Sequence, residues 1–79
     1  MDKDQQVQKD FLKEQFEWCK EQDRILEEIE TKLHLMKEIV EYALRHELAS
    51  AEINELNGQL DLLKRKVHSL EQQLSSVAH

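Results

Sequence analysis

The last third of the chain carries a seven-residue apolar repeat, which restricts the possible folds more than any other feature. Apolar side chains recur there at alternating steps of three and four residues, at Ile53, Leu56, Leu60, Leu63, Val67, Leu70, Leu74 and Val77. This spacing places one apolar seam along one side of an α-helix. The repeat therefore predicts a helix that packs lengthwise against another helix.

A second seam with the same spacing lies upstream, at Leu26, Ile29, Leu33, Met36, Val40 and Ala43. Continued from Val40, it reaches Glu47 and Asn54 and misses Ile53 by one residue, roughly 100° of helix rotation. One straight helix cannot bury both seams against the same neighbour, so we expect the chain to fold back on itself. Ile25, Leu35 and Ile39 form an additional apolar strip, which indicates more than one neighbour, as in a bundle.

We place the reversal at residues 47–50. Leu48 and Ile53 have the spacing of a hydrophobic staple around a helix start, with Ala49 at the N-cap and Glu52 at N3. Alanine is a poor N-cap, and Ser50 is the alternative cap. These signals predict a first helix over about 5–46 and a second over about 50–77.

Two alternatives to this turn remain open. Asn57-Gly58 is the better turn by dipeptide chemistry, although the downstream seam passes through it without losing step. The chain could also form a single unbroken helix. With no proline and one glycine among 79 residues, long helices are favoured in every case.

The predicted fold is all-α and occupies residues 1–79 as a single domain: an antiparallel, coiled-coil-like helical hairpin with unequal arms that associates into a dimeric helical bundle. In this register Lys64, Arg65 and Lys66 lie near Glu27 and Glu30, and flanking charges of opposite sign favour antiparallel pairing. The predicted hairpin core consists of Leu26, Ile29, Leu33, Met36, Val40, Ile53, Leu56, Leu60, Leu63, Val67, Leu70 and Leu74.

The unequal arms leave an aromatic segment without a partner. The second helix ends across from about Lys20, so Phe11, Leu12, Phe16 and Trp18 are expected in water, where a monomer seldom keeps an apolar patch. This segment docks either another protein or the same segment of a second copy. We favour a homodimer, because self-association requires no further partner.

Charge and hydropathy exclude several classes of function. The formal net charge of −6 argues against nucleic acid, which is bound mainly through Lys and Arg. No run of 18 apolar residues predicts a membrane span, and the acidic outer faces argue against a membrane surface. The polar stretch from Met1 to Asp10 is not a signal peptide. A lone cysteine suits the reducing cytoplasm.

No catalytic, cofactor-binding or metal-binding residues are predicted. The potential ligands His34, His46, His68, His79 and Cys19 lack the spacing of a helical zinc site. A single glycine excludes a Gly-rich phosphate loop, and no nucleophile motif is readable. We therefore expect a non-enzymatic interaction module, a regulator or adaptor. The alternative is a structural parallel coiled-coil rod or oligomerisation stalk.

Overall fold

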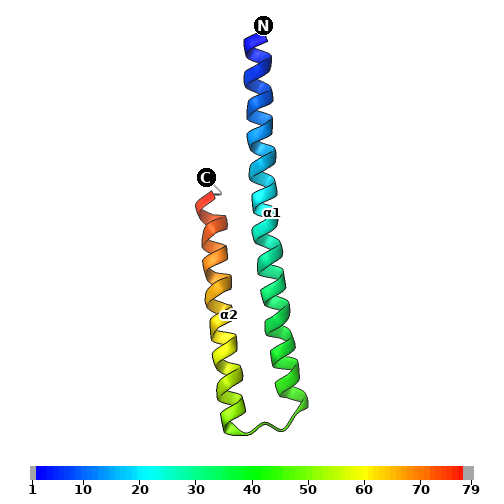
Figure 1. The fold of residues 1–79 in the computed structure, drawn as a ribbon, viewed down its shortest axis with the longest axis vertical. Helices are drawn as coiled ribbons and strands as arrows, with labels where there is room; N and C mark the ends of the chain where they lie inside the picture. The colour runs from blue at the N-terminus through cyan, green and yellow to red at the C-terminus, as the bar shows by residue number, and fades with distance from the viewer. Residues whose placement is uncertain (1, 78–79) are drawn as a thin grey trace.

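A computed structural model describes residues 2–77 as two α-helices, α1 (Asp2–Arg45) and α2 (Ser50–Val77). The chain is extended, with principal dimensions of 71 × 19 × 12 Å. α2 lies alongside the second half of α1 and runs back from the connecting loop, while the first half of α1 extends beyond the end of α2 (Figure 1). The predicted all-α architecture with two helices in contact is confirmed.

Local side-chain pairs support α1 along its exposed surface. Arg24 donates to both Glu21 and Glu28, with N–O distances of 2.6 Å to each carboxylate. Such pairs lie three or four residues apart and stabilise a helix by about 0.2–0.5 kcal/mol each. The length of α1 therefore follows from the lack of any helix breaker together with favourable local charge spacing.

At the C-terminal end of α1, His46 forms a hydrogen bond with one of the last carbonyl groups of the helix. The Nδ1 atom of His46 lies 2.8 Å from the carbonyl oxygen of Tyr42, and the two rings stack with centroids 4.1 Å apart. The last carbonyls of a helix lack partners within the helix, so a hydrogen bond donated by His46 satisfies one of them. This contact favours ending the helix at Arg45.

α2 begins at the position that the staple pattern indicates. The backbone N–H of Ile53 donates to the carbonyl of Ala49 at 3.0 Å, which makes Ala49 the N-cap residue. Leu48 and Ile53 line one hollow beside the loop, together with residues of α1. Asn57 and Gly58 lie inside α2, so the chain reverses at residues 46–49 and is not one unbroken helix.

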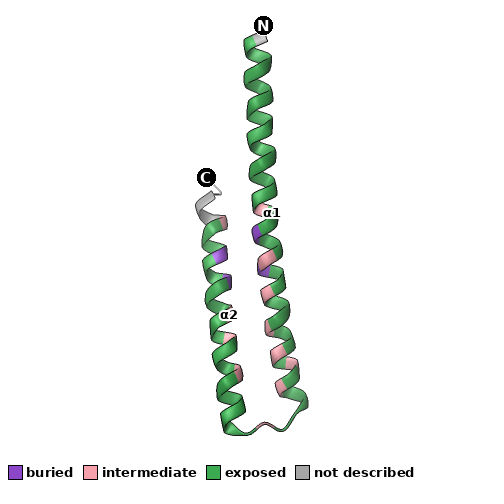
Figure 2. Ribbon diagram, viewed as in Figure 1, coloured by how far each residue is buried: buried purple, intermediate pink, exposed green. Residues whose placement is uncertain are grey.

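The core is small and lies near the middle of α1. Ile25 and Ile29 of α1 pack with Val67 and Leu70 of α2, and all four side chains are buried. Met36 and Leu74 pack against this cluster and are partly buried. Figure 2 shows the buried residues only on the stretch where the two helices lie side by side.

The seam of α1 differs from the predicted one. Leu26, Leu33, Val40 and Ile53, which were expected in the core, are 44–49% exposed. The α1 side chains that are buried or half-buried at three- and four-residue steps are instead Gln22, Ile25, Ile29, Lys32, Met36, Ile39 and Ala43. α1 is therefore rotated by roughly 50° from the predicted orientation. On α2, Leu56, Leu60, Leu63, Val67, Leu70 and Leu74 are buried or half-buried.

Lys32 explains why the sequence pattern favoured the other strip. Both strips share Ile29, Met36 and Ala43, and both have the spacing of a helical seam. The observed strip contains a lysine at its centre, which counts against it in any pattern of apolar residues. A lysine can bury its aliphatic stem while keeping the ammonium group in water, and Lys32 is indeed half-buried.

Candidate interaction surface

The N-terminal part of α1 exposes most of its large apolar side chains. Every residue from 3 to 21 is exposed, and we call this segment the overhang. Val7, Phe11, Leu12 and Phe16 are each 57–66% exposed, and Trp18 is 39% exposed. Figure 2 shows no buried residue on this part of α1. The predicted interface residues thus lie together on one exposed helical segment.

Phe11 continues the seam of α1 that α2 covers farther along. Extending the observed seam from Ile25 and Gln22 by the same alternating steps leads to Trp18, Gln15, Phe11 and Gln8. Val7, Gln8, Phe11 and Leu12 line a shallow hollow on this face. The side of α1 that packs against α2 therefore remains available for a second helix along the overhang.

Phe16 lies on a different side of the helix. It is five residues from Phe11, about 140° around the helix axis. The Nζ atom of Lys20 lies 5.5 Å from the centre of the Phe16 ring, which is a cation–π distance. The sequence analysis grouped Phe11 and Phe16 in one interface, whereas the structure places them on separate faces.

Charged and polar side chains border the overhang. The side chain of Gln6 donates a hydrogen bond to Asp10 at 3.1 Å. At the C-terminal end of the overhang, Glu21 accepts two hydrogen bonds from Arg24. The guanidinium of Arg24 donates to the Glu21 carboxylate and thereby holds the pKa of that carboxyl below its ordinary value. The pKa of Arg24 is raised for the same reason.

A second exposed apolar strip runs along the flank of α1. Leu12, Cys19, Leu26, Leu33 and Val40 recur every seven residues and are all exposed. A helix in a simple pair needs one narrow seam, whereas α1 has an apolar arc wide enough for a further neighbour. This flank was not singled out from the sequence, because its leucines and valine were assigned to the hairpin core.

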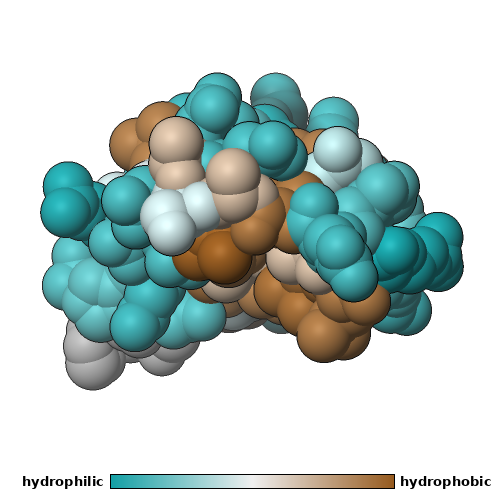
Figure 3. All heavy atoms as spheres, turned by 90° about the horizontal axis from the view of Figure 1, so that it is seen from below, coloured by the Kyte–Doolittle hydropathy of each residue, from teal (hydrophilic) through white to brown (hydrophobic). Residues whose placement is uncertain are grey.

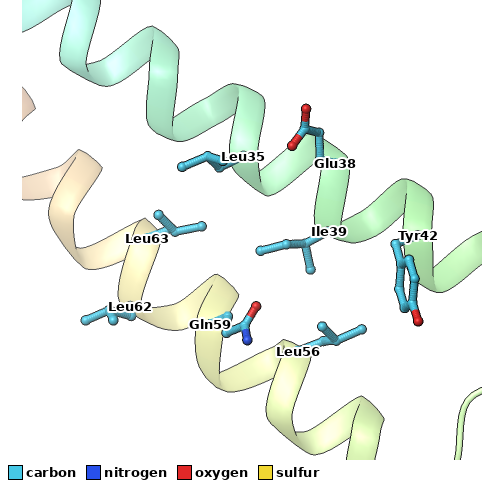
Figure 4. Close-up of a pocket in the computed structure, with 8 residues that line it drawn as sticks. All are labelled: Leu35, Glu38, Ile39, Tyr42, Leu56, Gln59, Leu62 and Leu63. Atoms are coloured by element: carbon cyan, nitrogen blue, oxygen red, sulfur yellow. The ribbon is translucent and has the colours of Figure 1, made fainter.

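An apolar groove of about 450 Å³ lies between the helices on the opposite flank. Leu35, Ile39, Leu56 and Leu63 border it, and Tyr42, Gln59 and Leu62 complete its rim with Glu38. Ile39 and Leu63 point toward each other across the gap, and the Glu38 carboxylate points away from α2 (Figure 4). The lining of the groove is mainly apolar, so it is suited to apolar contacts.

The loop end also exposes hydrophobic residues. Seen from this end, brown hydrophobic atoms reach the surface between hydrophilic ones (Figure 3). Leu44, in the last turn of α1, is 81% exposed. Leu44 lines the hollow beside the loop together with Leu48 and Ile53, so part of this apolar surface is gathered at the loop.

The potential metal ligands named from the sequence are not grouped in the part of the chain that the structure describes. Within residues 2–77, no three His, Cys, Asp or Glu side chains are grouped so that they could hold a metal ion. Cys19 is a free, exposed thiol. His34 pairs with Glu38 on the surface of α1, and His68 lies 3.4 Å from Gln72 on α2. His79 lies outside the described residues.

Neither helix, as far as residues 2–77 are described, contains an apolar stretch long enough to cross a lipid bilayer. Comparisons with protein-family models, with curated proteins and with solved structures found no match to this chain.

Proposed function

We propose that this chain is a non-enzymatic protein–protein interaction module that self-associates through the overhang. The proposed unit is an antiparallel helical hairpin, and two hairpins form a helical dimer. Exposure of Val7, Phe11, Leu12 and Phe16 on one helical segment carries the proposal, because a monomer seldom leaves such a group of side chains in water. Aromatic side chains also contribute strongly to binding energy at interfaces.

The length of the overhang supports the same conclusion. It is a helix of about five turns with no helix packed beside it in Figure 1. Most helical stability in proteins comes from packing of an apolar face. A partner that covers the overhang would therefore stabilise both the helix and the complex.

The small core points to association as well. Among the side chains that the structure describes, four large apolar ones are buried, which is little for a chain of 79 residues. Chains of this size often depend on oligomerisation. We propose that the dimer presents its remaining helical surfaces to a protein partner, as a regulator or adaptor does.

The charge and the single cysteine support a location and a class of partner. A net charge of −6 disfavours nucleic acid and anionic membrane surfaces. One cysteine without an internal partner suits a reducing compartment. We therefore propose a cytoplasmic protein whose partners are proteins, with no cofactor.

Light scattering over a range of protein concentrations tests self-association. The native chain should have twice the protomer mass of 9.4 kDa. A chain with Phe11→Ser, Phe16→Ser and Trp18→Ser should remain helical by circular dichroism but have the protomer mass. If this triple variant retains the native mass and an unchanged spectrum, the overhang does not mediate assembly.

A further inference from the structure

We infer that the two copies associate antiparallel and end to end, with each overhang covering the seam face of the other. This inference rests on the proposed self-association and specifies its geometry. It starts from the position of the seam: the face that α2 covers near Ile25 continues at the same three- and four-residue spacing to Trp18 and Phe11 on the overhang. A helix laid on that face extends an interface that already exists within the chain.

A parallel arrangement on this face is blocked by α2. If the α1 helices of two copies ran in the same direction with their overhangs in contact, each would continue straight along its neighbour. Beyond residue 21, the second α1 would then occupy the position that α2 holds beside Ile25 and Ile29. The parallel dimer therefore requires α2 to leave its own core.

An antiparallel arrangement avoids this collision. The α1 helix of the second copy then runs in the same direction as α2 of the first, along the part of α1 that α2 does not reach (Figure 1). The part of each copy in which α1 and α2 lie side by side is then located beyond the N-terminal end of the other copy's overhang. The contact is two-fold symmetric and closed, because the seam face of each overhang packs against the seam face of the other copy's overhang.

The register follows from centring one overhang on the other. The midpoint of the contact then falls at Leu12, and Phe11 of each copy lies between Phe11 and Gln15 of the other. The seam positions Gln8 and Gln15 are polar, and polar residues at seam positions fix the register and orientation of paired helices. Phe16 lies about 140° from Phe11 and stays outside this contact.

Spin labels on Cys19 give the first test, because it is the chain's only cysteine. In the end-to-end dimer the two Cys19 residues are separated by about 20 Å along the axis at 1.5 Å per residue. In a parallel dimer they lie about 10 Å apart, the distance between packed helices. A measured distance near the shorter value overturns the inferred orientation.

A second label separates end-to-end pairing from side-by-side pairing along the flank strip. In an antiparallel bundle centred on Leu26, Cys19 labels would again be roughly 20 Å apart, but labels at position 47 would be about 60 Å apart. In the end-to-end dimer, the positions 47 are about 110 Å apart, beyond the reach of dipolar coupling. A Glu47→Cys, Cys19→Ser chain should therefore show no coupling, and a distance near the 60 Å value overturns the inference.

Phe11→Gln and Phe16→Gln provide a matched pair of variants. The two phenylalanines are similarly exposed, at 57% and 64%, but lie on different faces of the same helix. End-to-end pairing predicts that Phe11→Gln weakens the dimer by at least about tenfold, while Phe16→Gln changes its dissociation constant less than about threefold. Equal losses from both variants contradict the inferred geometry.

The outcomes separate the inference from the proposed function. A native chain that is monomeric at every concentration removes the self-association and the geometry together. A native dimer with a short Cys19 distance, or with a 60 Å coupling at position 47, leaves self-association standing and overturns the end-to-end arrangement alone.

Discussion

Replacing Ile25 by alanine tests whether the observed seam holds the two helices together. Ile25 is 1% exposed and packs with Ile29, Val67 and Leu70. Truncating a buried isoleucine or leucine to alanine costs about 2–5 kcal/mol, and the cost is smaller where neighbours can relax into the space. Because a pair of helices is open on both flanks, we expect a loss of about 2–3 kcal/mol for Ile25→Ala.

This loss is large for a chain of this size. Folded domains have about 0.05–0.15 kcal/mol of stability per residue, so a loss of 2–3 kcal/mol removes a substantial part of the total. In a small domain each kcal/mol shifts the melting temperature by about 4–8 °C. Thermal and urea unfolding followed by far-UV circular dichroism should therefore show a clear shift for Ile25→Ala.

Leu26→Ala is the matched control. It removes a side chain of similar size from the neighbouring position, but Leu26 is already 47% exposed. We expect a cost below about 1 kcal/mol, because roughly half of the apolar surface is not taken from water on folding. Both changes are best made in a Phe11→Gln chain at low protein concentration, where self-association contributes least. If Leu26→Ala destabilises as much as Ile25→Ala, the seam assignment is refuted.

Three further predictions concern the helices and can be checked by the same unfolding experiments. Gly58→Ala should stabilise the chain by about 0.5–1 kcal/mol, because Gly58 lies inside α2 and an added Cβ would meet no atom within 4 Å; a destabilisation would show that this site is packed. Ala49→Ser should stabilise by up to about 1 kcal/mol through a side-chain N-cap, and no change would show that Ala49 is not the cap. The pKa of Glu21 is lowered by Arg24, so the stabilisation from this pair is present above the ordinary glutamate pKa of about 4.3 and is lost as the pH falls through the lower folded-state value. Arg24→Gln should remove this acid-sensitive step in helicity, and an unchanged titration would contradict it.

The sequence predicted the number and kind of elements well, because the signals involved are local. The lack of proline, the heptad spacing on the second helix and the Leu48–Ile53 staple all report on nearby residues. They led to a turn at 47–50, and the structure has its loop at residues 46–49. The dipeptide Asn57-Gly58 was tolerated within α2 because α2 is held by its seam.

The choice of seam on α1 could not be made from local spacing. Two strips share Ile29 and Met36, and only packing against α2 decides between Ile25 and Leu26. The observed seam also calls for a different explanation of the break between the two helices. Continued by heptads, Ile39 reaches Ile53 in phase, whereas Ala43 reaches Asn57 and misses Leu56 by one residue, so the choice of strip accounts for only part of the apparent slip. The His46–Tyr42 contact and the staple account for the break instead.

The sequence identified the segment that carries the candidate surface, but it grouped the residues of this segment in one interface. Their positions in the sequence alone place Phe11, Phe16 and Trp18 within two helical turns of one another. Their division between a seam face and a far face depends on where α2 sits, which follows from the packing of Ile25. The flank strip of Leu26, Leu33 and Val40 was missed for the same reason, since its residues were assigned to the core.

Amide hydrogen exchange, measured residue by residue over a range of protein concentrations, tests most directly whether the overhang is covered. Amides of α1 near Ile25 and Ile29 should be protected at all concentrations, because α2 packs against them. Amides around Phe11 and Leu12 should exchange rapidly in dilute solution and become protected as the concentration rises. Rapid exchange around Phe11 at every concentration, with the two-helix core intact, would contradict self-association through this segment.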